Sequence, residues 1–347
     1  MKILIIIKWF VRYNGAARVA YELAKRFSKL HDVYIASYAD YIEKDWEREF
    51  EIYKIKCKGM FSINELNELQ RIIKPDVIHS HDWIGLLFKF SGVPQVATNH
   101  SNWPKNWFIS FKHFASGFLQ EIPHYIKLKS VNEVVCVSKY QQEVYRKIGI
   151  NSVVIYNGID ERFLTKPEND IDLKRPCTLF VGRIDKRKAK HLIPIIKSIN
   201  KKMDAHHYII GYPADTILIK KLKNIENVQY LGVVDDIRPY YRNADVLMFT
   251  SRLEAFPLTP LEAMACGLPV VAFDVCSHRE IIKHRETGFL ANAGNINEFT
   301  NFVLTILNDE ELKKRMGVRA IKTVKKKFLW DDKVEKYLQL FERVTLL

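Results

Sequence analysis

Short apolar runs alternate with longer amphipathic stretches along most of the 347 residues. The apolar runs predict strands, and the stretches with an apolar residue at every third or fourth position predict helices. In the first half, the predicted strands are 3–7, 33–36, 77–79, 93–98, 133–137 and 153–155, and the predicted helices are 16–30, 64–73 and 139–147. This alternation is typical of a parallel sheet that is covered by helices.

A polar segment at 161–176 interrupts the alternation, and its charges, two prolines and lack of periodicity indicate a linker. Strands are then predicted at 178–181, 205–210, 228–231, 246–249 and 270–273, and one or two basic amphipathic helices over 310–347. The sequence therefore predicts an α/β protein with two Rossmann-like, doubly wound domains. Such domains place ligands at the carboxyl ends of their strands, so we expect a central cleft that both domains face.

The formal net charge of +14 suits a phosphate-bearing partner but does not distinguish a nucleotide from nucleic acid or anionic lipid. No RNP motif, helix-turn-helix signature or zinc finger is present, so no nucleic-acid partner is expected. The five widely spaced cysteines indicate free thiols in a reducing cytosol. The apolar run at 3–7 is too short for a signal peptide, and nothing approaches the roughly 18 apolar residues that span a bilayer. We expect a cytoplasmic protein, soluble or peripheral on the inner face of the membrane.

Two glutamates, Glu254 and Glu262, follow the strand predicted at 246–249. Pro257 and Pro260 force a turn between them, and a helix from about Thr259 would place Glu262 in its first turn. The amides at the helix start could hold an anion, and a carboxylate there could bind the two hydroxyls of a ribose. For a lone glutamate the favourable helix dipole is the simpler explanation, so the interpretation depends on the whole pattern.

A basic loop, Gly182-Arg183-Ile-Asp-Lys-Arg-Lys188, follows the first predicted strand of the second half. Arg183 and Lys188 could neutralise a diphosphate, with Arg187 as a rival ligand. Taken alone, the loop would more simply be a solvated basic turn. Neither half opens with GxGxxG, which argues against a dinucleotide-dependent oxidoreductase.

These two motifs closely resemble the E-x7-E and G-R-x4-K-G elements of the retaining glycosyltransferases of the GT-B fold, family four in the sequence classification (glycosyl transferases group 1). Ala189 replaces the second glycine. The resemblance implies that Glu254 contacts the donor sugar near the reacting centre and that Glu262 binds the ribose. It further implies that the donor's diphosphate is held by Arg183 and Lys188, beside Gly182, and by the backbone of Phe256, Pro257 and Leu258.

The resemblance extends weakly through the first half. Gly15 lies in the first strand-to-helix loop, where the family usually has two glycines near the phosphates. His100 resembles the family's histidine that points toward the donor sugar, although a lone histidine is more often structural. Two further histidines, His79 and His81, lie at the end of another predicted strand. The family's architecture implies an acceptor domain over 1–165, a donor domain over 166–325, and a C-terminal helix over 326–347 that packs back on the N-terminal domain.

The implied reaction is the retaining transfer of a hexose-type sugar from a nucleoside-diphosphate sugar to a hydroxyl of a glycan, a lipid-linked or a small-molecule acceptor. Arg183 and Lys188 would stabilise the leaving diphosphate, so neither a metal nor a cofactor is expected. Asp170-Ile-Asp172 spells a metal-binding DxD motif, but it lies in the predicted linker and is better explained as solvated loop. The alternatives are a phosphorylase or epimerase of related fold, and a non-catalytic basic protein that binds nucleic acid or membranes.

An aromatic stripe follows His100, in a predicted helix that Asn102 would cap and Pro123 would end. Its members fall on one face at helical spacing: Trp103, Trp107, Phe111, Phe114, Phe118 and Ile122. Such a stripe more often packs into its own domain. The alternative is a surface for an apolar acceptor or an anionic membrane, which the positive net charge would favour.

Overall fold

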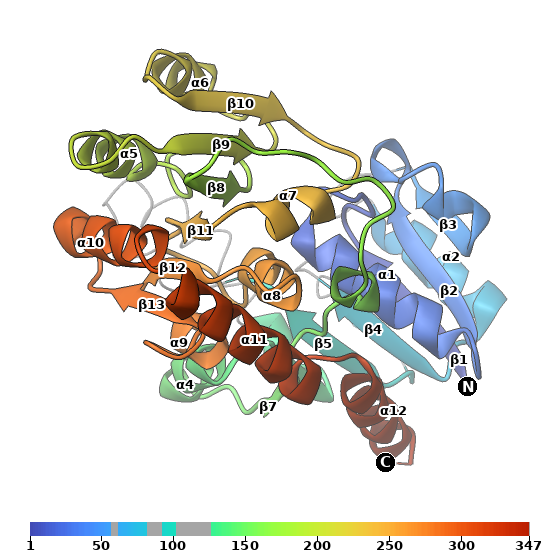
Figure 1. Cartoon of the computed structure of the whole chain (residues 1–347). Coiled ribbons are helices and arrows are strands. Elements are labelled where there is room, and N and C mark those ends of the chain that lie inside the picture. The colour runs from blue at the N-terminus through green and yellow to red at the C-terminus, as the bar shows by residue number, and fades with distance from the viewer. Residues whose placement is uncertain (57–61, 82–91, 102–125, 347) are drawn as a thin grey trace. The chain divides into compact units, whose positions relative to one another are not determined.

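The computed structural model describes residues 1–56, 62–81, 92–101 and 126–346 (Figure 1). They form two compact units, one of Met1–Gly158 with Trp330–Leu347 and one of Ile159–Leu329. Each unit contains a parallel sheet with helices packed against it, as the β–α alternation predicts. No helix within the described residues is long and apolar enough to cross a lipid bilayer.

The first unit contains a seven-stranded sheet in the order β3-β2-β1-β4-β5-β6-β7. Its strands are β1 Lys2–Ile7, β2 Asp32–Tyr38, β3 Glu51–Ile55, β4 Val77–His81, β5 Gln95–Asn99, β6 Glu133–Cys136 and β7 Val153–Val154. Its helices are α1 Gly15–Phe27, α2 Ser62–Ile73, α4 Lys139–Lys147 and α12 Asp331–Thr345, with short 3-10 turns at Ala39–Tyr41 and Trp46–Arg48. The sequence pattern did not predict β3, because this edge strand carries Glu51 and Lys54 and buries little of its surface.

The second unit contains a six-stranded sheet in the order β10-β9-β8-β11-β12-β13. Its strands are β8 Cys177–Val181, β9 His206–Ile210, β10 Val228–Gly232, β11 Val246–Phe249, β12 Val270–Phe273 and β13 Gly288–Ala291. Its helices are α5 Leu192–Asn200, α6 Thr216–Lys223, α7 Arg238–Asn243, α8 Leu258–Ala265, α9 His278–Ile281, α10 Ile296–Leu307 and α11 Glu310–Lys327. The short edge strand β13, which begins with a glycine, was not predicted.

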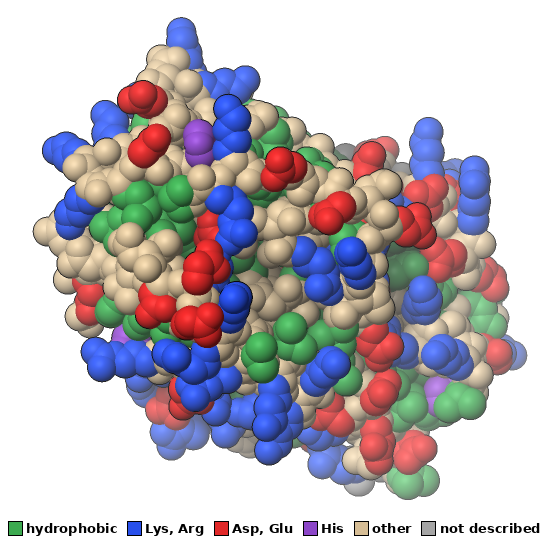
Figure 2. Space-filling view, viewed as in Figure 1, with side chains coloured by type: hydrophobic (Ala, Val, Ile, Leu, Met, Phe, Trp, Pro, Cys, Tyr) green, Lys and Arg blue, Asp and Glu red, His purple; other side chains and the backbone are tan. Residues whose placement is uncertain are grey.

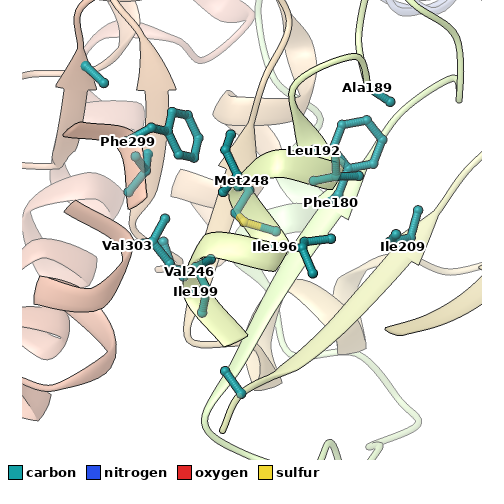
Figure 3. Close-up of a cluster of buried hydrophobic side chains, with 14 of the residues drawn as sticks. Phe180, Ala189, Leu192, Ile196, Ile199, Ile209, Val246, Met248, Phe299 and Val303 are labelled. Carbon is teal, nitrogen blue, oxygen red and sulfur yellow. The ribbon is translucent and has the colours of Figure 1, made fainter. Parts of the chain in front are cut away.

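The core of the second unit holds its two central strands in place (Figure 3). Phe180 of β8 and Met248 of β11 pack in one buried cluster with Ile196 of α5 and Phe299 of α10. These four side chains are at most 2% exposed, and an interior packed this densely resists displacement of its strands. The loops that leave β8 and β11 therefore start from fixed positions.

The segment that the sequence presents as a linker begins inside the second unit. Glu161–Leu164 forms a 3-10 turn whose Phe163 is 1% exposed. Arg242 donates from Nη2 to the carbonyls of Phe163 and Thr165, at 3.2 and 2.9 Å. The buried Phe163 and these two hydrogen bonds from Arg242 hold the polar segment within the second unit. The change of unit follows Gly158 instead of residue 165.

The C-terminal helix α12 packs back on the first unit, as the resemblance implied. Its Tyr337 and Phe341 rings lie 6.3 and 5.4 Å from the ring of Phe27 on α1. The preceding Trp330 is 1% exposed, and its ring covers the Cα of Gly158.

We expect Gly158→Ala to lower the melting temperature, because a Cβ at this position would lie 2.3–2.7 Å from three ring atoms of Trp330. Overpacking of this kind typically costs about 1–3 kcal/mol. Gly15→Ala is the matched control, since its Cβ would meet no atom within 4 Å in the part of the chain that the structure describes. Thermal melting followed by circular dichroism measures both variants, and equal melting temperatures would show that Trp330 moves aside without cost.

Basic side chains are distributed over the surface. On the face in Figure 2, Lys and Arg side chains and Asp and Glu side chains are scattered among uncharged surface, with several Lys and Arg side chains together at the lower left. Helix α11 ends in Lys325, Lys326 and Lys327, where the helix dipole favours cations. Part of the net charge of +14 therefore has a purely structural explanation.

Candidate functional site

The strand order of the second sheet brings the two strongest sequence motifs to one edge. β8 pairs with β9 on one side and with β11 on the other, with Leu247 opposite Leu179. Parallel neighbours end at the same edge, and the order of connections reverses between them, which is where open α/β sheets bind ligands. The basic loop after β8 and the glutamate-containing loop after β11 therefore lie beside each other.

The basic loop is fixed at both ends by buried apolar side chains. Ile184 and Ala189 are fully buried, so the position where the family usually has glycine here contributes a methyl group to the core. At the loop entrance, Gly182 has φ +153°, and a Cβ on Gly211 would lie 1.9 Å from the carbonyl oxygen of Gly182. The backbone is thus closely packed where it leaves β8.

Asp185 organises the cations of this loop. Its Oδ1 accepts hydrogen bonds from the backbone N–H groups of Arg187 and Lys188, at 2.9 and 3.0 Å. Its Oδ2 accepts from Nε of Arg183 at 2.8 Å and lies 2.6 Å from Nη2 of the same side chain. Arg183 is thereby oriented, whereas the rival Arg187 approaches Asp185 only to 3.6 Å and its side chain is 67% exposed.

Lys188 and Glu254 form an ion pair, with 2.9 Å between Nζ and Oε1. Ser251 donates from Oγ to the same carboxylate oxygen at 2.8 Å. The Lys188 and Glu254 side chains remain 29% and 19% exposed, so both are accessible to a ligand. The structure thus brings together Lys188 and Glu254, two residues that the sequence analysis singled out from separate motifs.

Glu262 lies in the second turn of α8, later in the helix than predicted. Helix α8 begins at Leu258 and has no acidic residue in its first turn, so the prediction of Glu262 in that turn is wrong. Pro257 can serve as the N-cap residue, which starts the helix one residue earlier and moves Glu262 into the second turn. There the glutamate is 3% exposed, and its Oε2 accepts a hydrogen bond of 3.0 Å from the hydroxyl of Tyr241.

The start of α8 is held by buried side chains. Phe256 is 6% exposed and its ring lies 5.8 Å from that of Phe328. Pro257 makes no side-chain capping hydrogen bond to the first-turn amides, a point at which a helix can receive an anion. This geometry is compatible with the role expected of the Phe256–Leu258 backbone.

His278 on α9 is a buried residue close to Glu254 that the sequence analysis did not identify. It is fully buried, and its Nδ1–H donates to the carbonyl of Phe273 at 2.7 Å. Burial lowers the pKa of His278, and the nearby Glu254 carboxylate opposes that shift. No sequence motif marks this position, because only the fold brings α9 close to the loop after β11.

In the first unit, Gly15 is the first residue of α1. The preceding Asn14 caps the helix, and its Oδ1 accepts from the amides of Ala16 and Ala17 at 2.9 and 3.3 Å. A Cβ on Gly15 would meet no atom of the described residues within 4 Å. Its contact with the donor stays a prediction.

His100 directly follows β5 and is linked to His81 at the end of β4, with 2.9 Å between His100 Nε2 and His81 Nδ1. Burial lowers the pKa of His100 to about 4 and the pKa of His81 well below its usual value. Gln141 of α4 donates from Nε2 to the carbonyls of Asn99 and Ser101, at 3.1 and 2.7 Å, which fixes the loop on both sides of His100. His100 is therefore a neutral, positioned imidazole.

The remaining motifs have these positions. Asp170 accepts hydrogen bonds from Asn243 and from the backbone of Ile171, in a segment that precedes β8 and does not follow a strand. Among the described residues, no group of three or more His, Cys, Asp and Glu side chains could hold a metal ion.

The four described cysteines, Cys136, Cys177, Cys266 and Cys276, are free thiols. The aromatic stripe from Trp103 to Ile122 lies outside the described residues.

Both halves of the chain match family profiles. Residues 161–323 match the profile described as glycosyl transferases group 1, and residues 13–163 match that described as glycosyltransferase family 4. An uncharacterized glycosyltransferase of Methanocaldococcus jannaschii is 27% identical in an alignment that covers 99% of each chain. The N-acetyl-alpha-D-glucosaminyl L-malate synthase of Bacillus anthracis is 28% identical over 54% of this chain and 52% of its own.

Solved structures share the fold at low sequence identity. The sucrose-phosphate synthase of Thermosynechococcus elongatus superposes with a TM-score of 0.83 at 17% identity, covering 99% of this chain and 98% of its own. Anabaena HepE, solved in complex with UDP and glucose, superposes with a TM-score of 0.82 at 18% identity, covering 99% of this chain and all of its own. These proteins therefore share the fold of two parallel sheets, each covered by its own helices.

Proposed function

Because the chain belongs to glycosyltransferase family 4 and has the GT-B fold, it is a glycosyltransferase, and we propose that its donor is a nucleoside-diphosphate sugar held by the second unit. The observation that carries this proposal is the ion pair between Lys188 and Glu254 at the point where the strand order reverses, with Arg183 on the same loop as Lys188. Two cations suit a diphosphate, and a carboxylate beside them suits the hydroxyls of the attached sugar.

The donor makes four kinds of contact in this proposal. Arg183 and Lys188 bind the diphosphate, together with the backbone of Phe256–Leu258 at the start of α8. Glu262 binds the ribose, and its burial beside Tyr241 fits a hydroxyl-binding carboxylate that is held rigidly. Glu254 binds sugar hydroxyls near the anomeric carbon, and the role of His100 at the sugar stays a prediction.

The proposed reaction retains the anomeric configuration. The bond between the anomeric carbon and the diphosphate oxygen breaks, and the acceptor oxygen bonds to the same face of the sugar through an oxocarbenium-like state. The departing phosphate oxygen takes the acceptor's proton. Fixed cations at the leaving group lower the barrier because they stabilise charge that develops only as this bond breaks.

Relatives support the class of donor without identifying the sugar. The Anabaena protein HepE was solved with UDP-glucose as well as with UDP, and the Bacillus relative is named for an N-acetylglucosaminyl transfer. We therefore propose a hexose-type sugar on a nucleoside diphosphate, with a hydroxyl of a glycan, a lipid-linked or a small-molecule acceptor as its target. Peripheral binding to the inner face of an anionic membrane stays a prediction.

A transfer assay tests the proposed function against the two enzyme alternatives. Purified protein is incubated with a nucleotide sugar and either an acceptor mixture or inorganic phosphate, and free nucleoside diphosphate and sugar products are quantified. We expect release of nucleoside diphosphate that depends on the acceptor and gives an α- or β-glycoside of the donor's own configuration. Sugar phosphate formed only with inorganic phosphate would indicate a phosphorylase, and a changed sugar on intact nucleotide an epimerase.

We expect transfer to continue in excess EDTA, because in this scheme Arg183 and Lys188 supply the positive charge at the leaving group. The measurement compares initial rates with and without EDTA, after extensive dialysis, and then with added magnesium or manganese. Rates within about twofold of each other agree with electrostatic stabilisation by the side chains. Complete loss that either metal restores would contradict it.

A further inference from the structure

A pair of histidines joins the ends of two neighbouring strands in the first unit. His81 ends β4, His100 follows β5, and Nδ1 of the first lies 2.9 Å from Nε2 of the second. The ring centroids are 5.2 Å apart with the planes only 10° from parallel, which fits a hydrogen bond lying near both ring planes. Good alignment of this kind makes the contact a well-formed hydrogen bond.

Both imidazoles are neutral at pH 7. Burial lowers the pKa of His100 to about 4, and burial with its histidine neighbours lowers that of His81 well below the usual value. A neutral imidazole carries one hydrogen, on either nitrogen, so the contact needs one partner as donor and the other as acceptor. Two arrangements are therefore available, and they differ in the nitrogen of His100 that carries the hydrogen.

The other nitrogen of His81 selects between these arrangements. His81 is fully buried, and its Nε2 has no hydrogen-bond partner among the residues that the structure describes. A buried N–H without an acceptor is rarer and more costly than a buried acceptor without a donor. The hydrogen of His81 therefore sits on Nδ1 and is donated to Nε2 of His100. His100 must then carry its own hydrogen on Nδ1.

The adjacent His79 does not compete for this contact. Its Nε2 lies 2.8 Å from Oγ1 of Thr98, which lies 3.1 Å from the hydroxyl of Tyr337. His79 is also fully buried and sits two residues before His81 on the same strand. It is therefore a matched control for the loss of a buried imidazole.

We propose that His81 is a positioning residue that fixes the tautomer of His100, so that His100 presents an Nδ1–H donor to an oxygen of a bound sugar. The sugar contact rests on the proposed function, whereas the tautomer does not. His81 acts through His100 and need not touch the substrate. Nothing in the sequence of either strand distinguishes His81 from His79 for this role.

The tautomer is measured directly by two-bond ¹⁵N–¹H correlation spectra of the full-length protein labelled with ¹⁵N-histidine, with His100 assigned by substitution. We expect the Nδ1–H form of His100 in the wild type and in His81→Asn, whose side-chain amide can donate from about the position of the imidazole Nδ1. In His81→Leu we expect a shift toward the Nε2–H form. His79→Leu should leave the tautomer of His100 unchanged even if both leucine variants melt at lower temperature.

Steady-state kinetics test the consequence for transfer. We expect kcat to fall about tenfold in His81→Leu, with the affinity for free nucleoside diphosphate unchanged, and to recover to within about twofold in His81→Asn. The Nε2–H form in the wild type would overturn the proposal, as would an unchanged kcat in a variant whose tautomer has switched. Absence of transfer in a wild type with the expected tautomer would instead overturn the proposed function.

Discussion

Replacing Arg183 and Lys188 together with alanine should weaken nucleoside-diphosphate binding by about 2–4 kcal/mol, or roughly 30- to 1,000-fold in Kd. Both cations lie on the loop after β8 and each is held by a carboxylate, Arg183 by Asp185 and Lys188 by Glu254. The double variant removes two positive charges and leaves the two carboxylates, so a bound diphosphate would face uncompensated negative charge. Calorimetric titration with the free nucleoside diphosphate measures the loss.

Arg187→Ala is the control for this experiment. The side chain belongs to the same loop and carries the same charge, but it is 67% exposed and reaches Asp185 only at 3.6 Å. A change of less than about twofold in Kd is expected, because exposed ion pairs contribute little. Unchanged affinity in the double variant, or a large loss in Arg187→Ala, would move the phosphate-binding role to another cation.

Glu254→Gln should lower kcat by about 100-fold while free nucleoside diphosphate binds as tightly as before or severalfold more tightly. The kcat falls because the carboxylate contacts the sugar near the reacting carbon. The affinity can rise because Lys188 is no longer neutralised by Glu254, whose Oε1 lies 2.9 Å from Nζ. A partly exposed ion pair of this kind is worth roughly 0.2–1 kcal/mol, which limits the gain to severalfold.

Glu262→Gln should instead weaken the binding of free nucleotide, because the partner of Glu262 in this proposal is the ribose. Tyr241→Phe is the matched control, since it removes the hydrogen bond to Glu262 but leaves the carboxylate. Binding that survives in Tyr241→Phe and is lost in Glu262→Gln assigns the loss to the ribose and not to the packing of α8. Equal loss of free-nucleotide affinity in Glu254→Gln and Glu262→Gln would refute the division of roles.

Apolar periodicity predicted most of the fold because central strands are buried on both faces. It located β1, β8 and β11 to within one residue, because nearly every residue of these strands is buried. The edge strand β3 was missed because it carries charges and buries little of its surface. The edge strand β13 is mostly buried, but it has only four residues and begins with a glycine, so its apolar run is too short to stand out. The segment predicted as a linker lies inside the second unit, where Phe163 is buried among polar neighbours.

Sequence motifs marked Lys188 and Glu254, which the structure brings together, but not the residues that hold them in place. The approach of Lys188 to Glu254 follows from two loops leaving neighbouring parallel strands, which strand order makes predictable. Asp185 could have been found from its place between the cations, and Ser251 from its spacing to Glu254. His278 could not, because its proximity depends on how α9 packs, and the tautomer of His100 depends on a hydrogen bond between strands.

The central claim is that the second unit binds a nucleoside-diphosphate sugar, and calorimetric titration of the wild-type protein with UDP-, GDP- and ADP-sugars tests it most directly. We predict saturable binding with one site per chain for one nucleotide series, and loss of that binding in the Arg183→Ala, Lys188→Ala double variant. Absence of saturable binding for all three series, in protein that melts cooperatively, would contradict the account.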